Sequence, residues 1–287
     1  MQLRTLPQVQ IELNHKTLDL SKTHVMGILN VTPDSFSDGG QYNCLEYALK
    51  HAKEMVAQGA SIIDIGGEST RPDAVAVGIE QEIQRVIPVV EAISQQLDVF
   101  ISIDTSAPEV MQAAVQAGAH IWNDVRALTR PDALEMAAKL DIPVILMHMR
   151  GEPSTMNNLA HYKNVVKEVI VELQQRIEAA LQAGIRPQHI ILDPGFGFAK
   201  NAAQNLELLN QLYQFNDYFA MPWLSGLSRK RFLGEAVGGA AVNDRLYAGL
   251  AGHLMSVQQG ASIVRTHDVL ATVQHLKLWQ VCQCQSN

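Results

Sequence analysis

The sequence predicts a closed barrel of eight β/α units formed by a single domain of residues 1–287. From residue 24 onward, short apolar runs of strand length alternate with longer segments whose apolar residues recur at helical spacing. Four of the helical segments end at a Gly that precedes the next apolar run, as expected where a helix closes in the left-handed conformation. A barrel of this kind takes roughly 250 residues. An open doubly wound sheet is the alternative, and it usually has fewer strands at this length.

The apolar runs give the order of the expected elements. Residues 1–23 precede the repeats and contain two alternating segments around Asn14-His15, which predicts a hairpin that closes one end of the barrel. The helix after the third strand is expected to begin with a capping box formed by Ser106 and Glu109. The eight barrel strands are expected at residues 25–31, 61–66, 99–104, 120–125, 143–149, 189–193, 219–224 and 262–266.

Composition narrows the class of protein. The net charge is −7 and there is no run of Lys or Arg, which argues against a nucleic-acid partner. No apolar run approaches about 18 residues, so we expect no membrane span. We see no basic and apolar leader, so we do not expect secretion. The sparse, odd set of Cys44, Cys282 and Cys284 is typical of a reducing cytoplasm. We therefore expect a cytoplasmic protein that binds neither nucleic acid nor a membrane.

Polar residues stand where the predicted strands end, which is where barrels of this class bind their ligands. One group combines carboxylates, an amide and an ammonium inside apolar flanks: Asp104, Asn123, Asp193 and Lys230. Buried carboxylates could accept paired hydrogen bonds from a flat heterocycle such as an aminopyrimidinone. The structural alternative is that the two acids only pair with the lysine and stabilise the barrel mouth.

A second group supplies cations, donors and one neutral oxygen: Asn30, Thr70, Arg71, Arg265 and His267. Such a set suits a pyrophosphate accompanied by Mg²⁺, because that ion keeps most of its waters and takes few protein ligands. The sequence thus indicates a ring-binding pocket lined by acids and an anion-binding rim lined by cations.

Several long motifs occur in order along the chain: GILNVTPDSFSDGG, IDIGGESTRP, SIDTS, NDV, LDPGFGF, SRK and a closing R-x-H. Together they are highly specific, and nearly the whole chain from residue 24 closely resembles the dihydropteroate synthase family of pterin-binding barrels. The resemblance implies an enzyme of folate biosynthesis that joins hydroxymethyl-dihydropterin pyrophosphate to para-aminobenzoate, giving dihydropteroate and pyrophosphate. It also implies a homodimer and a target of sulfonamides.

The resemblance assigns roles to individual residues. Asn30 looks like the Mg²⁺ ligand, and with Arg265 and His267 it forms the catalytic set. The pterin pocket would be Asp104, Asn123, Asp193 and Lys230, and the pyrophosphate arm would contact Thr70, Arg265 and His267. The second substrate would meet Phe36, Arg71, Pro72 and Ser228, and Ser228 is expected at a helix start, which favours a carboxylate. Asp73 and Ala199 depart from the family pattern, which commonly has Gly at both positions.

The predicted reaction has an SN1-like course, in which the pyrophosphate leaves first and the pterin ring delocalises the resulting cation. Two other interpretations remain. A methyltetrahydrofolate-binding methyltransferase domain would share the acid pocket but lack the pyrophosphate rim. A non-catalytic pterin-binding barrel would lack loop or rim residues, whereas the sequence contains the SRK and R-x-H motifs and the long first loop.

Overall fold

The computed structural model describes residues 4–13, 16–32, 41–68 and 77–284. The hairpin strands are β1 (Gln10–Leu13) and β2 (Lys16–Asp19). The barrel strands are β3 (His24–Asn30), β4 (Ile62–Gly66), β5 (Phe100–Asp104), β6 (Ile121–Asp124), β7 (Val144–Met147), β8 (Ile190–Asp193), β9 (Leu224–Ser225) and β10 (Ile263–Thr266). All neighbouring barrel strands pair in parallel, in the order β8-β7-β6-β5-β4-β3-β10-β9.

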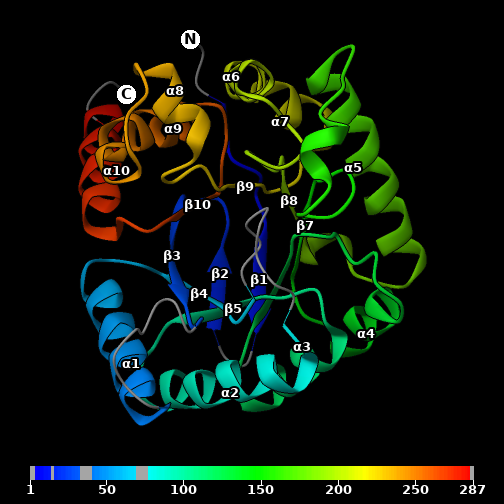
Figure 1. The fold of residues 1–287 in the computed structure, drawn as a ribbon, viewed down its shortest axis with the longest axis vertical. Coiled ribbons are helices and arrows are strands. Elements are labelled where there is room, and N and C mark those ends of the chain that lie inside the picture. Colours follow the sequence, from blue (N-terminus) through cyan, green and yellow to red (C-terminus); the bar gives the residue numbers. More distant parts are fainter. Residues whose placement is uncertain (1–3, 14–15, 33–40, 69–76, 285–287) are drawn as a thin grey trace.

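A parallel bridge between Leu192 and Trp223 brings the two ends of this sheet together. The helices surround the strands (Figure 1). The predicted (β/α)₈ barrel is therefore confirmed. The helices are α1 (Gln41–Ala57), α2 (Ile79–Gln96), α3 (Pro108–Ala117), α4 (Ala133–Leu140), α5 (Val165–Gln182), α6 (Ala202–Asn210), α7 (Tyr213–Phe219), α8 (Arg231–Ala236), α9 (Leu246–Gln258) and α10 (Val269–Cys284), with short 3₁₀ segments η2 (Met156–Leu159), η3 (Pro187–His189) and η4 (Val242–Asp244).

The floor of the barrel is an apolar layer to which every barrel strand contributes one buried side chain. The hairpin residues Ile11, Leu18 and Leu20 pack against this layer. The hairpin therefore closes the end of the barrel where the strands begin, as the sequence predicts. The layer consists of Met26, Ile62, Phe100, Ile121, Ile145, Ile191, Leu224 and Ile263.

The joints between helices and strands follow the sequence pattern. The glycines that end four helical segments have φ between 96° and 110°, a region that only glycine adopts without strain. They are Gly59, Gly118, Gly184 and Gly260. On the outside of the barrel, the predicted apolar stripe of α5 is buried against the strands. None of the helices within the described ranges is long and apolar enough to cross a membrane.

Two local predictions are wrong. The seventh strand is expected at residues 219–224, but α7 extends to Phe219, Ala220 has φ 49°, and β9 comprises only Leu224 and Ser225. An apolar run this short does not distinguish a helix end from a strand. The expected capping box is also absent, because the Ser106 hydroxyl bonds Asp124. Pro108 opens α3 instead, where its missing N–H has no helical partner to lose.

Candidate active site

Above the apolar floor, the inward-facing position becomes polar on several of the strands. In β4, Asp64 lies two residues after the floor residue Ile62, and side chains two apart in a strand face the same side. The same step leads from Ile121 to Asn123 in β6 and from Ile263 to Arg265 in β10. The strand direction thus places charged and amide groups toward the carboxyl end of the barrel, on top of an apolar plug.

Asp64 is a functional candidate that the sequence patterns did not predict. Its side chain is fully buried, and its Oδ2 accepts hydrogen bonds from Arg265 Nε at 2.6 Å and from Asn123 Nδ2 at 3.1 Å. Its Oδ1 has no hydrogen-bond partner in the described part of the chain. A carboxylate in the middle of the buried strand IIDIG is the signal that could have identified it, because buried charges need partners.

Arg265 joins two acids of the pocket. Besides Asp64, its Nη2 donates to Asp104 Oδ2 at 2.8 Å. Burial by itself would lower the pKa of Arg265, but the carboxylates of Asp64 and Asp104 outweigh that effect and raise it. The sequence-based division into an acid pocket and a separate cationic rim is therefore wrong for this residue, since Arg265 belongs to both.

The cations around Asp104 and Asp193 offset only part of the effect of burial on the pKa values of these acids. Burial raises the pKa of Asp104 to about 7, opposed by Arg265 and reinforced by the charge of Asp64. Burial also raises the pKa of Asp193 to about 6, although the Gly195 N–H donates to Asp193 Oδ1 at 2.7 Å. A ligand that brought hydrogen-bond donors to these carboxyls would favour their charged form.

A tight loop after β8 shapes the side of the pocket that Lys230 occupies. Lys230 Nζ lies 4.2 Å from the centre of the Phe198 ring, and burial lowers its pKa to about 8. Gly197 has φ 78°, a conformation that favours glycine, and a Cβ there would lie 3.0 Å from Lys230 Cδ. Ala199 has φ 48°, a conformation in which the family's usual Gly would be unstrained.

The ammonium group of Lys200 holds the loop after β8 in place by hydrogen bonds. Its buried Nζ donates to His148 Nδ1 and to the carbonyls of Gly195 and Phe198, at 2.9, 2.9 and 3.0 Å. Burial lowers the pKa of Lys200 to about 7. His148 in turn contacts Glu172 through Nε2 at 3.0 Å. The sequence did not point to Lys200, because nothing local indicates that a lysine after a glycine-rich loop is buried.

Three predicted residues lie at the rim. Asn30 ends β3 and is exposed beside Asp104: a Cβ at Gly66 would lie 3.7 Å from Asn30 Oδ1 and 3.9 Å from Asp104 Oδ2. Ser228 Oγ lies 3.1 Å from His267 Nδ1. The prediction that Ser228 starts a helix is wrong, because α8 begins at Arg231 and its N-cap is Lys230.

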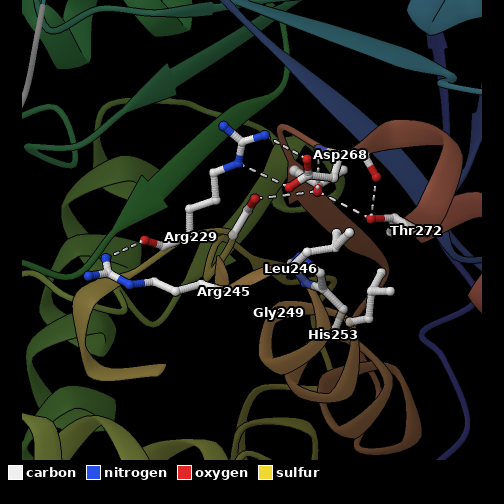
Figure 2. Close-up of a pocket in the computed structure, with 10 residues that line it drawn as sticks. Arg229, Arg245, Leu246, Gly249, His253, Asp268 and Thr272 are labelled. Carbon is white, nitrogen blue, oxygen red and sulfur yellow. Dashed lines mark hydrogen bonds and ion pairs between the residues drawn. The ribbon is translucent and has the colours of Figure 1, made fainter. Parts of the chain in front are cut away.

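A narrow crevice lies behind this rim, between the turn after β9 and the helices α9 and α10. Figure 2 shows Arg229 reaching Asp268 on one side and residues of α9 below. None of the pocket acids lines it. The crevice is therefore separate from the acid pocket. The predicted contacts Phe36, Thr70, Arg71 and Pro72, and the departure Asp73, lie outside the described residues.

A (β/α)₈ barrel with a cluster of charged side chains at the carboxyl ends of its strands has the architecture of an enzyme, because the active sites of such barrels lie at that end. Residues 26–267 match the family described as pterin binding enzyme. The dihydropteroate synthase of Escherichia coli K12 is 51% identical over 262 residues, which cover 91% of this chain and 92% of the relative. The chain belongs to the dihydropteroate synthase family of pterin-binding enzymes, and it is a transferase of folate biosynthesis.

Solved structures agree with this assignment. Xanthomonas albilineans dihydropteroate synthase with 4-aminobenzoic acid has a TM-score of 0.90 and 46% identity, covering 96% of this chain and 98% of that one. The same enzyme in complex with 7,8-dihydropteroate has a TM-score of 0.87 and 44% identity, with coverage of 96% and 98%.

Proposed function

We propose that this chain joins hydroxymethyl-dihydropterin pyrophosphate to para-aminobenzoate, forming dihydropteroate and releasing pyrophosphate. The observation that carries the proposal is the set of buried acids bridged by Arg265 at the carboxyl end of the barrel. The ligands named for the Xanthomonas albilineans enzyme, 4-aminobenzoic acid and 7,8-dihydropteroate, are the second substrate and the product of this reaction.

The pocket chemistry suits the pterin ring. A pterin presents adjacent N–H groups, which a carboxylate accepts in a paired, charge-assisted geometry. Asp193 is the best-placed acceptor, because it is buried and the Gly195 N–H occupies only its Oδ1. Asn123 supplies an amide whose Nδ2 is already oriented by Asp64. Lys230 and the Phe198 ring border the same space.

The pyrophosphate end is assigned to Arg265 and His267. The C–O bond of the methylene group breaks, and its electron pair leaves with the pyrophosphate. The ring spreads the resulting positive charge, and the nearby Asp104 carboxyl can stabilise it. The amine nitrogen of para-aminobenzoate then forms the new C–N bond and loses a proton. Closing the site against water protects such a cation.

Asn30 would hold Mg²⁺. Asn30 is exposed, and its amide oxygen and the Asp104 carboxyl both face the space over Gly66 at the mouth of the barrel, which fits a hard cation that prefers oxygen ligands and keeps several waters. When bound there, Mg²⁺ would neutralise part of the charge that develops on the pyrophosphate.

The decisive assay measures dihydropteroate formed from the two purified substrates, with Mg²⁺ present. We expect turnover that requires both substrates. Pterin binding without turnover would replace the proposal by a non-catalytic pterin-binding barrel, and methyl transfer from methyltetrahydrofolate would replace it by a methyltransferase. Positional isotope exchange within the pyrophosphate in the absence of aminobenzoate tests the SN1-like course, and its absence would contradict a free cation.

We also infer a cytoplasmic homodimer formed through the outer helices. Several apolar side chains are exposed on the neighbouring segments α8 to α10, with Tyr247 81% exposed. The others are Val237, Val242, Leu278 and Val281. Light scattering after gel filtration should give twice the 31.6 kDa of one chain, and Tyr247→Asp should shift it toward the monomer. A wild-type protein that stays monomeric at high concentration would exclude the dimer.

A further inference from the structure

Ser228 and His267 form a closed hydrogen-bonded pair at the rim. Ser228 lies in the turn after β9, and His267 directly follows β10. The Ser228 hydroxyl oxygen accepts the backbone N–H of His267 at 3.2 Å, and the same oxygen lies 3.1 Å from His267 Nδ1. Ser228 is 8% exposed. The hydroxyl is therefore held between the backbone and the ring of one residue.

The hydrogen bond between Ser228 and His267 determines which ring nitrogen of His267 carries the proton. A hydroxyl has one proton to donate. The Ser228 oxygen accepts the His267 backbone N–H at 3.2 Å and the Thr266 hydroxyl at 3.5 Å, which leaves the Nδ1 of His267, at 3.1 Å, as the partner for the Ser228 proton. If Ser228 donates to Nδ1, that nitrogen carries no proton, and a neutral imidazole must carry its proton on Nε2. The hydroxyl proton is then committed, so Ser228 has none left for a substrate carboxylate.

The surroundings favour the neutral ring. Burial, followed by the positive charges of Arg265 and Arg229, lowers the pKa of His267 to about 4. Lys230 also lowers the pKa of His267, whereas the carboxylate of Asp268 raises it. His267 thus faces more cations than anions from β10 and from the turn after β9.

An ion pair fixes the two segments against each other. Arg229 Nη2 donates to Asp268 Oδ1 at 2.6 Å and Arg229 Nε donates to Asp268 Oδ2 at 3.1 Å, so the immediate neighbours of Ser228 and His267 are joined in bidentate fashion. On the other side, the Arg229 carbonyl accepts from Arg245 Nη1 at 3.0 Å. Figure 2 shows Arg229 between these two partners. Arg229 has φ 58°, so its backbone needs such support.

We propose that Ser228 is a positioning residue that sets the tautomer of His267, so that the ring presents Nε2–H as a hydrogen-bond donor to the leaving pyrophosphate. The Arg229–Asp268 ion pair keeps Ser228 within reach of the ring. This inference rests on the proposed function, in which His267 contacts the pyrophosphate end of the substrate. It assigns Ser228 a role different from the aminobenzoate contact that the family resemblance implies.

The tautomer is measured directly by ¹⁵N NMR of the full chain labelled in its histidine rings, with His267→Gln used to assign the signals. We expect a neutral His267 at pH 7 with its proton on Nε2. In Ser228→Ala the preference should weaken and the Nδ1 signal should shift. A wild-type ring protonated on Nδ1, or doubly protonated at pH 7, would overturn the proposal whether or not the enzyme assay succeeds.

Steady-state kinetics test whether the tautomer of His267 affects turnover. Ser228→Ala should lower kcat about 10–100-fold, the range found for partners that orient metal-binding histidines. Ser228→Thr keeps the hydroxyl and should recover most of this loss. His267→Gln, whose amide can replace Nε2–H, should retain more activity than His267→Asn, whose shorter amide mimics Nδ1. Equal losses in those two variants, or wild-type kcat in Ser228→Ala, would contradict the proposal.

Ser262→Ala is the matched control. Ser262 is buried too, at the opposite end of β10, and its hydroxyl has no hydrogen-bond partner in the described residues. The same truncation there should leave kcat and the His267 signals unchanged. If wild-type protein forms no dihydropteroate, the proposed function fails, while the NMR result still decides the tautomer. If turnover is normal but the His267 ring carries its proton on Nδ1, only the inference about Ser228 fails.

Discussion

Removing the carboxylate of Asp64 should be one of the most destabilising single changes in the barrel. This residue is 0% exposed and accepts two hydrogen bonds, one of them from the charged Arg265. In Asp64→Ala, Arg265 keeps only Asp104 as a close carboxylate among the described residues, and the Asn123 amide loses its acceptor. The substitution thus leaves a largely buried cation, with its side chain 21% exposed, and a buried amide donor under-compensated.

The magnitude follows from the number and kind of these contacts. Removing one partner of a buried ion pair costs about 3–5 kcal/mol, and each hydrogen bond to a charged group is worth about 1.5–3 kcal/mol. We therefore expect Asp64→Ala to lower the free energy of unfolding by about 3–5 kcal/mol, a large part of the roughly 5–15 kcal/mol that holds a typical domain together. Asp64→Asn retains the shape and one acceptor oxygen, and its loss should be smaller.

Urea unfolding followed by circular dichroism measures this change, with the midpoint compared at a common slope. Asp98→Ala is the control, because Asp98 also pairs with a cation, Lys16, at 2.8 Å but is 94% exposed at its side chain. That surface variant should leave the midpoint unchanged. If Asp64→Ala also unfolds at the wild-type midpoint, the buried pair does not carry the stability that its geometry indicates.

Three further outcomes follow from the same site. Asp104, whose pKa is raised to about 7, and Asp193, whose pKa is raised to about 6, keep a proton in the folded protein at pH values where the unfolded chain has lost it. Their contribution to stability should therefore fall as pH rises above about 4, by about 1.4 kcal/mol for each pH unit over which one of these carboxyls stays protonated only in the folded state. The buried histidines His148, His253 and His267, whose pKa values are lowered to about 4, 3 and 4, act in the opposite direction below about pH 6.5, so the carboxyl is isolated by comparing variants. In thermal melts, Asp193→Asn should gain stability relative to wild type as pH rises from about 4 to 6; a difference that does not change with pH would be contrary. Arg265→Ala should weaken binding even of a pterin without pyrophosphate, because both of its carboxylate partners lose their cation. If a fluorescence titration of Arg265→Ala gave the same pterin Kd as wild type, Arg265 would belong only to the pyrophosphate rim, as the sequence indicated. Asn30→Ala should raise the Mg²⁺ concentration needed for half-maximal turnover without changing the Kd of a free pterin, and an unaltered Mg²⁺ dependence would remove Asn30 as the ligand.

Local sequence patterns were sufficient to predict the architecture and the end of the barrel that carries the chemistry. Hydrophobic periodicity is a local property, so it located the barrel strands to within a few residues, except at the seventh strand. The repeated glycines after helices marked the joints, because their left-handed conformation is a property of the single residue. Parallel strands all end at one side of a barrel, so Asn30, Asp104, Asn123 and Asp193 could be grouped from their positions in the chain alone.

The pairing of these groups, in contrast, depends on the folded barrel. Arg265 bonds Asp64 across 201 residues and Asp104 across 161, and Ser228 meets His267 across 39. Such partners are set by strand register and by the closure of the barrel, which local sequence does not encode. The same reason explains why Asp64 and Lys200 were not predicted: burial of a charged side chain depends on what the rest of the chain places around it, and that is a property of the assembled barrel.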